Sequence, residues 1–169
     1  MALWRDGGFA DDIWTTLDDS AAIPDRGAIV VSFARWSADK AALAARADPV
    51  GVAIAAGADA VEQLVEAAKR PLVALKFDKF ADGRAFSYAE LLRERHGFAG
   101  ELRATGEVLL DEIPLMARCG FTSFEVTDEP TQRALSEGRL PTAHLYYQPS
   151  VVLSEAPAGT RPWLRRATL

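Results

Sequence analysis

Short apolar runs rich in β-branched residues alternate with amphipathic segments of about ten residues along most of this chain. Each run is bounded by turn residues, which is typical of a buried strand, and the segments between the runs keep one apolar face at helical spacing. The pattern predicts strands at Ala28–Phe33, Val50–Ala55, Leu72–Phe77, Glu101–Ala104 and Ser123–Val126, with a candidate last strand at His144–Gln148.

Strands that alternate with helices predict an α/β fold, because a parallel strand pair needs a crossover about as long as a helix. We therefore expect a mainly parallel sheet of five to six strands. Right-handed crossovers would place helices on both faces, which gives three layers. The alternative is half of a βα barrel that another chain would have to complete.

Local signals mark several helix ends. Ser87 with Glu90 resembles a capping box and predicts a helix start, and Gly97 predicts the end of that helix. Pro114 is expected to kink the following helix, because its ring clashes with the carbonyl one turn earlier. Asp128 is expected to cap the next helix.

The two ends of the chain lack the alternation. Residues 1–26 predict an N-terminal flap in which Asp6-Gly7-Gly8 closes a short hairpin, packed on a single domain that spans residues 1–150. Residues 151–169 form a basic tail with Arg161, Arg165 and Arg166, which we interpret as mobile or partner-binding.

Composition excludes several classes of protein. A net charge of −5 disfavours nucleic acid as a partner. No apolar run approaches the ~20 residues that cross a bilayer, and the first residues lack a signal peptide's basic and apolar regions. A single cysteine fits a reducing compartment, so we expect a cytoplasmic protein.

The sequence has neither a phosphate-binding loop of the Walker type nor a dinucleotide-binding glycine motif. Cys119, His96 and His144 are too few for an iron–sulfur cluster or a zinc site. We therefore predict no metal and no cofactor, although a metal site made only of carboxylates, which nothing in the sequence favours, and a flavin stay open. Cys119 is a redox candidate, but at the end of a helix the dipole raises a thiol pKa, which favours a structural role.

Polar residues gather where two predicted neighbouring strands end, and ligands of open parallel sheets bind at that edge. Guanidinium groups and free backbone N–H groups favour anions, so the pattern predicts a small-oxyanion or phosphate site. The alternative is that Asp82 and Glu101 pair with the arginines and tie loops together. The candidate residues are Asp82, Gly83, Arg84, Arg103, Thr105 and Gly106.

One set of residues, spread over about residues 12–148, forms a recognisable pattern: Asp12, Trp14, Phe80, Asp82 to Arg84, Ser87, Ala89, Leu92 to Arg95, Gly97, Gly100 to Ala104, Gly106, Arg118 to Phe121, Tyr147 and Gln148. This pattern resembles that of the bacterial domain-of-unknown-function family 934. Pro114 departs from it, at a position where a large apolar residue is expected.

Members of that family are described as probable oxidoreductases involved in sulfite reduction, so the resemblance implies sulfur assimilation. It implies as partners sulfite reductase or another enzyme of that pathway. We expect an accessory protein that binds a small oxyanion or the reductase. The alternatives are a small oxidoreductase or other enzyme for an anionic substrate, and a homo-oligomeric assembly module.

Overall fold

The computed structural model describes residues 2–57, 59–79, 82–143, 145–146, 150–151, 156–158 and 161–166. Its centre is an eight-stranded sheet with the order β2-β1-β8-β7-β6-β5-β4-β3. The strands are β1 Ala2–Arg5, β2 Gly8–Ala10, β3 Trp14–Thr16, β4 Ala28–Ser32, β5 Val50–Ala55, β6 Leu72–Phe77, β7 Glu101–Gly106 and β8 Ser123–Val126.

Neighbouring strands from β3 to β8 run parallel, while β1 is antiparallel to both β8 and β2. The predicted hairpin is confirmed: β1 and β2 are joined at Asp6 and Gly7, with φ values of 52° and 79°. Two successive positive φ angles are the geometry that matches the twist of a two-residue hairpin turn. The sheet is therefore mixed, with a parallel body and an antiparallel edge.

The expectation of five to six strands is wrong, because the residues assigned to a flap supply three further strands. Strands β1 and β2 extend the sheet beyond β8, and β3 extends it beyond β4. Each of these strands has at most four residues, too few for a distinct alternating pattern in the sequence.

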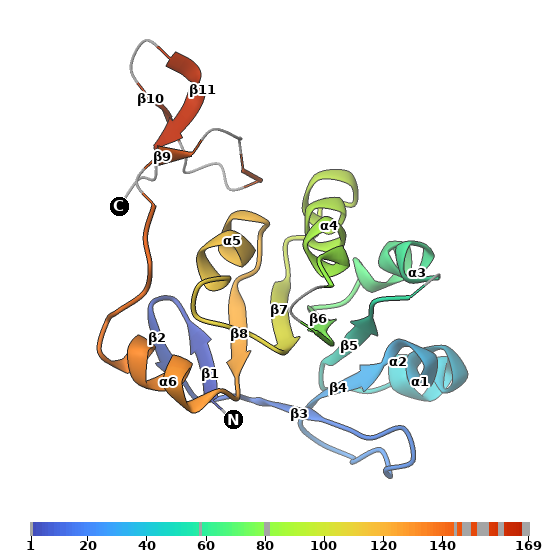
Figure 1. Ribbon diagram of the computed structural model, residues 1–169. Coiled ribbons are helices and arrows are strands. Elements are labelled where there is room, and N and C mark those ends of the chain that lie inside the picture. Colours follow the sequence, from blue (N-terminus) through green and yellow to red (C-terminus); the bar gives the residue numbers. More distant parts are fainter. Residues whose placement is uncertain are drawn as a thin grey trace.

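The prediction of helices on both faces of the sheet is also wrong. From β4 to β8 the strand order follows the chain without reversal, so crossovers of one hand place every helix on the same side. The helices share one apolar core with that side of the sheet (Figure 1). They are α1 Phe33–Ala38, α2 Lys40–Ala44, α3 Ala60–Ala67, α4 Arg84–Glu90, the π-helical turn η1 Leu91–Arg95, α5 Ile113–Arg118 and α6 Glu129–Ser136.

A short connection shows how strongly the sheet curls. Strands β2 and β3 lie at opposite edges of the sheet, yet only Asp11, Asp12 and Ile13 separate them. Four peptide steps span at most about 14 Å, whereas seven strand spacings in a flat sheet would need about 34 Å. The sheet therefore curls into a half-barrel, and residues 11–13, which we call the strap, cross its concave side (Figure 1). The half-barrel alternative fits this architecture; its completion by another chain stays a prediction.

Several helix ends differ from the local signals. Helix α4 begins at Arg84, so Ser87 lies inside the helix and the predicted capping box is wrong. Pro114 occupies the first turn of α5, where its missing N–H is harmless, and the predicted kink is wrong. Gly97 does take the left-handed conformation (φ 63°), and Asp128 does cap α6 by accepting from the Thr131 N–H at 2.8 Å.

The C-terminal segment contains a second, three-stranded sheet. It is formed by β9 Leu145–Tyr146, β10 Ala156–Ala158 and β11 Arg161–Arg166. Of the predicted strand His144–Gln148, residues Leu145 and Tyr146 lie in β9, and His144, Tyr147 and Gln148 lie outside the described residues. Within the described part of the chain, no helix has the length and apolarity to cross a membrane.

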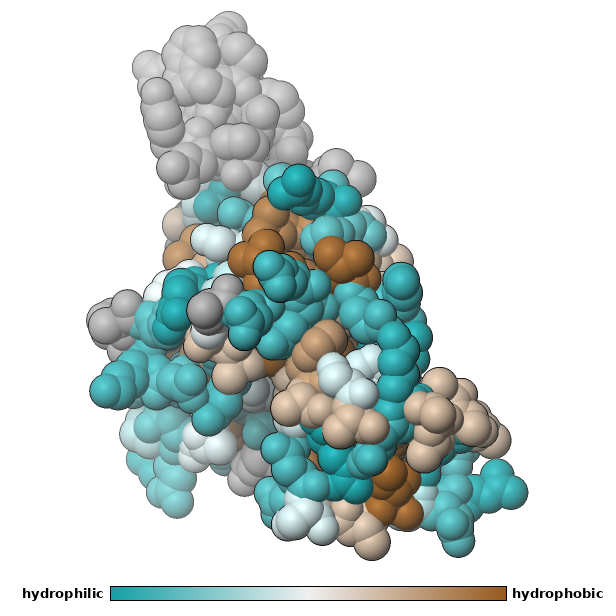
Figure 2. Space-filling view, turned by 90° about the vertical axis from the view of Figure 1, so that its right-hand side faces the viewer, coloured by the Kyte–Doolittle hydropathy of each residue, from teal (hydrophilic) through white to brown (hydrophobic). Residues whose placement is uncertain are grey.

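The face seen in Figure 2 is mainly hydrophilic, with separate apolar patches among the described residues. Large apolar side chains that are exposed are Phe9, Ile13, Val61, Val65 and Leu115. Ile13, on the strap, is 73% exposed.

Candidate functional site

The two faces of the sheet differ in side-chain size and polarity. The helix-covered face carries large apolar residues, such as Val52, Leu75 and Leu102, none of which is exposed at all. On the concave face, one row runs across five strands in a continuous register: Ser32, Ala53, Ala74, Arg103 and Ser123. The residues of this row are thus small, apart from Arg103, whose long cationic side chain lies among them.

A hollow of about 510 Å³ lies on the concave face. In a complete βα barrel large branched side chains fill this space, but here much of the floor is alanine. The missing side-chain volume leaves room for a ligand. The hollow is lined by Thr16, Val30, Ser32, Ala53, Ile54, Ala55, Ala74, Lys76, Arg103, Thr105, Gly106 and Glu125.

Arg103 holds two carboxylates beside the hollow. Its Nη1 donates to Asp12 Oδ2 at 2.7 Å and its Nη2 to Asp12 Oδ1 at 3.0 Å, so the strap is bound bidentately to the middle of β7. Its Nε and Nη2 donate to Glu101 Oε1 at 3.0 and 2.8 Å. Ser123 Oγ also donates to that oxygen, at 2.7 Å. This network accounts for the burial of a charged side chain that is only 2% exposed.

The network shifts the pKa values of both partners. Burial by itself would raise the pKa of Asp12, but hydrogen bonds from Arg103 and from the Trp14 N–H outweigh burial and lower it. Burial likewise opposes the charge of Arg103, and the Asp12 and Glu101 carboxylates nevertheless raise its pKa. Arg103 therefore stays charged, and four hydrogen bonds to its own carboxylates occupy it.

The structure brings three of the predicted site residues together. Arg103, Thr105 and Gly106 follow one another along β7 and all line the hollow. Gly106 has φ 84°, and a Cβ there would lie 2.2 Å from the Phe77 carbonyl oxygen. Only glycine fits this close approach, so its place in the sequence motif has a packing reason.

The other three predicted residues do not line the hollow. Arg84 forks onto the Asp82 carboxylate two residues earlier, with Nε at 2.8 Å and Nη2 at 2.7 Å. Hydrogen bonds from Arg84 lower the pKa of Asp82 to about 2. Gly83 lies between them as the N-cap of α4. The Asp82–Arg84 segment thus forms an exposed local ion pair, as the alternative reading of these residues expected.

Sequence reasoning missed two charged residues of the hollow, Lys76 and Glu125. Each interrupts an apolar strand at a position whose neighbours on both sides are buried. In a strand covered on one face only, such a position points to the opposite face. That charged residue within an apolar strand was the available signal. We expected helices on both faces of the sheet, so the signal did not indicate an uncovered face.

Cys119 is buried at the C-terminal end of α5. Burial, and then the neighbouring Glu90 carboxylate, raise the pKa of its thiol to about 12. The thiol contacts Glu90 Oε1 at 3.6 Å. A thiol of this kind is protonated near neutral pH and is a poor nucleophile, which agrees with the structural interpretation.

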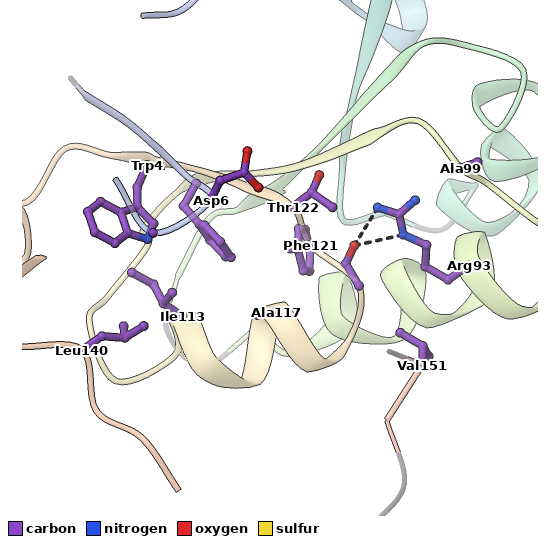
Figure 3. Close-up of a pocket in the computed structure, with 13 residues that line it drawn as sticks. Trp4, Asp6, Arg93, Ala99, Ile113, Ala117, Phe121, Thr122, Leu140 and Val151 are labelled. Carbon is purple, nitrogen blue, oxygen red and sulfur yellow. Dashed lines mark hydrogen bonds between the residues drawn. The ribbon is translucent and has the colours of Figure 1, made fainter. Parts of the chain in front are cut away.

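A second cavity, of about 560 Å³, lies near the N-terminal ends of β7 and β8 (Figure 3). Arg93 lies at its edge and donates to the carbonyl oxygens of Gly120, Phe98 and Gly100. A Cβ on Gly120 would lie 2.6 Å from Arg93 Cγ, so glycine is required there for the arginine to pack. Arg93 therefore clamps two loops together, the η1–β7 loop and the α5–β8 loop, and because these carbonyls occupy its guanidinium group we regard this cavity as secondary to the hollow.

Among the described residues, no three His, Cys, Asp or Glu side chains gather as a metal site. Residues 51–157 match a family described as a bacterial protein of unknown function, domain-of-unknown-function family 934. No curated protein and no solved structure matches the chain. The match includes β5 to β8, and hence Arg103, Thr105, Gly106 and Glu125 of the hollow.

Proposed function

This chain belongs to the bacterial domain-of-unknown-function family 934, and we propose that it binds an organic anion of cofactor size in the hollow of its concave sheet face. The observation that carries the proposal is the uncovered floor of small residues, Ala53, Ala55 and Ala74, between polar and charged side chains. Ligand sites of proteins combine an apolar floor with a few polar groups in this way.

The size of the hollow favours an organic ligand over a bare oxyanion. Sites for cofactor-sized molecules measure about 300–1,000 Å³, a range that includes the 510 Å³ of the hollow. A sulfite ion displaces about two water molecules, roughly 60 Å³ of liquid. It would leave most of the hollow filled with water on an apolar floor, which offers it no hydrogen bonds.

The anionic end of the ligand is assigned to Lys76 rather than to Arg103. Lys76 Nζ pairs with Asp78 at 2.8 Å, and both side chains are about half exposed. Exposed ion pairs contribute only about 0–1 kcal/mol, so a ligand anion can replace Asp78 at little cost. Displacing Asp12 or Glu101 from buried Arg103 would instead leave a carboxylate without its partner, at a cost of about 3–5 kcal/mol.

Within the cell, we propose an accessory role in sulfite reduction, beside sulfite reductase or another enzyme of sulfur assimilation. The pathway rests on the family resemblance, and the accessory role on the state of Cys119, whose raised thiol pKa disfavours redox chemistry at that residue. The alternative is a small oxidoreductase that works through a bound organic cofactor, such as a flavin, in the same hollow.

Thermal unfolding with two probes tests the site. Flavin mononucleotide combines a flat apolar ring with a phosphate, and sodium sulfite supplies the bare oxyanion. We expect the flavin to raise the Tm of the full chain and sulfite to leave it unchanged. Ala53→Trp fills the hollow and should abolish the flavin effect, whereas Lys76→Gln should weaken it several-fold and make it insensitive to salt.

The control is Ala42→Trp, which adds the same side chain at an exposed position of α2. This variant should respond to the flavin like the unmodified chain. A flavin effect that survives Ala53→Trp, or stabilisation by sulfite in both tryptophan variants, would contradict binding in the hollow. Copurification of the tagged chain without any reductase component would contradict the accessory role alone.

A further inference from the structure

Among the described residues, the carboxyl groups of Asp12, Glu101 and Glu125 lie on the concave side of the sheet, and the first two have hydrogen-bonding partners. Asp12 and Glu101 accept the hydrogen bonds of Arg103, and Glu101 also accepts from Ser123. Glu125 is the third, and it lines the hollow from β8. Among the described residues, no donor forms a hydrogen bond with its carboxyl group.

The register explains why Glu125 is left without a donor. Arg103 pairs with Ser123, so the guanidinium lies beside the first half of β8 and its hydrogen bonds point toward Glu101 and the strap. Glu125 lies two residues further along β8, and its neighbour on β1 is the apolar Leu3. The geometry thus gives Glu125 a half-buried position in which no described residue forms a hydrogen bond with its carboxyl group.

The surroundings of Glu125 disfavour its ionised form. Burial is the largest cause and raises the pKa of its carboxyl group above the ordinary value for glutamate. The Asp12 carboxylate on the strap adds to that increase, while Arg103 on β7 and the positive amino terminus oppose it. An ionised carboxylate at this position loses hydrogen bonds to water and gains none from the described residues of the protein. The neutral, protonated form is therefore favoured.

We propose that the carboxyl group of Glu125 is protonated and donates a hydrogen bond to the ligand of the hollow. The ligand presents the acceptor, a carbonyl oxygen or a ring nitrogen. This inference rests on the proposed function, because it concerns the same ligand. Lys76 and Glu125 lie on either side of β7, so the hollow has a cationic side and an acidic side. The ligand therefore places its anionic group at β6 and its acceptor at β8.

Dicyclohexylcarbodiimide tests whether Glu125 holds a proton at neutral pH, and it needs no ligand. This apolar reagent takes up the carboxylic proton on one nitrogen while the carboxylate oxygen bonds to its central carbon. The O-acylisourea then rearranges to a stable N-acylurea, so the adduct is the sum of the two reactants. At pH 7 we expect Glu125 to be labelled about fivefold or more faster than exposed Glu62, because only the protonated form reacts.

Peptide mass spectrometry of the intact, folded chain measures both rates. Glu125→Gln should remove the adduct from its peptide and leave Glu62 unchanged. Ala53→Trp should slow the labelling of Glu125, because the reagent reaches it through the hollow, and Ala42→Trp should not. Equal rates at Glu125 and Glu62, or a rate unaffected by Ala53→Trp, would overturn the inference.

The two proposals fail separately. If Glu125 is labelled rapidly but flavin mononucleotide does not bind, the proposed class of ligand is wrong and the assignment of the proton stands. If the flavin binds in the hollow but Glu125 reacts no faster than Glu62, only the assignment of the proton is wrong.

Discussion

The two faces of the sheet use the same strands for opposite purposes. On the convex face, large apolar residues such as Ile54, Leu75 and Leu102 pack against the helices in one continuous core. On the concave face, Ala53, Ala74 and Arg103 leave a hollow and hold a buried ion-pair network. Adjacent residues of one strand thus pack in the core on one side and line the hollow on the other.

This difference explains why one face tolerates a hollow. Burial of large side chains on the convex face contributes about 1.5–3 kcal/mol for each residue, so that face supplies most of the apolar packing of the sheet. The concave face is closed by a polar contact instead, because Arg103 binds Asp12 of the strap across 91 positions of sequence. The short strap sets the curl of the sheet, this ion pair fixes the strap to β7, and the helices provide the apolar packing.

The largest expected effect comes from removing the cation of the concave face. Arg103→Met keeps most of the side-chain volume but leaves Asp12 and Glu101 without their shared partner. We expect a loss of about 3–5 kcal/mol in the free energy of unfolding, measured by urea denaturation, because breaking one side of a buried ion pair strands the other charges.

The companion variant is Arg103→Met with Asp12→Asn and Glu101→Gln, which removes the charges together. It should recover a substantial part of the lost stability, because the amides no longer carry an uncompensated buried charge. A single variant as stable as the unmodified chain would show that the strap is held by other contacts.

A second prediction compares one substitution on each face. Leu75→Ala on the convex face should reduce the free energy of unfolding by about 2–5 kcal/mol, since the side chain is fully buried among the helices. Ala53→Leu on the concave face adds volume into the hollow and should change it by less than about 1 kcal/mol. A large loss from Ala53→Leu would mean that the hollow is packed in solution.

These differences also mark what the sequence could predict. The runs at Val50–Ala55 and Leu72–Phe77 gave the parallel strands correctly, because buried β-branched runs are a strong local signal. Whether the sheet reverses its strand order is not encoded in any one run. The sequence therefore did not predict that helices cover only one face, nor that Lys76 and Glu125 line a hollow on the other face.

The candidate site shows the same limit. Thr105 and Gly106 were predicted at a strand end, and they do line the hollow. Arg84 was predicted in the same site, but it pairs with Asp82 two residues earlier. Only the geometry of the loop shows that this pair forms in place of a contact with the hollow. Asp12 lies far from Arg103 in sequence, and no spacing rule connects them, so the central contact of the concave face was not predictable.

The third prediction concerns pH, where two carboxyl groups of the concave face act in opposite directions. The folded pKa of Asp12 is lowered, so its contribution to stability is present above its unfolded pKa of about 3.8 and is lost as pH falls through the folded value. The folded pKa of Glu125 is raised above its unfolded value of about 4.5. Stability therefore decreases as pH rises from the unfolded pKa to the folded pKa of this group.

Urea denaturation of two variants across pH 3–7 separates these contributions. Asp12→Asn should be less stable than the unmodified chain at pH 7 and should approach it in acid, whereas Glu125→Gln should be more stable at pH 7 and lose that advantage in acid. Changes of the same sign in both variants would show that the two carboxyl groups do not differ as the structure indicates.

The smallest expected effect separates the concave face from the loop after β6. Arg84→Ala removes an exposed arginine whose partner, Asp82, lies two residues away, and we expect neither the urea midpoint nor the flavin-induced change in Tm to move. Lys76→Gln also removes one exposed cation, but from the hollow, and should weaken the flavin effect. Because the two variants lose the same charge, screening and net charge affect them equally. If Arg84→Ala weakens binding and Lys76→Gln does not, the ligand lies on the loop, and the hollow is an unfilled half of a barrel.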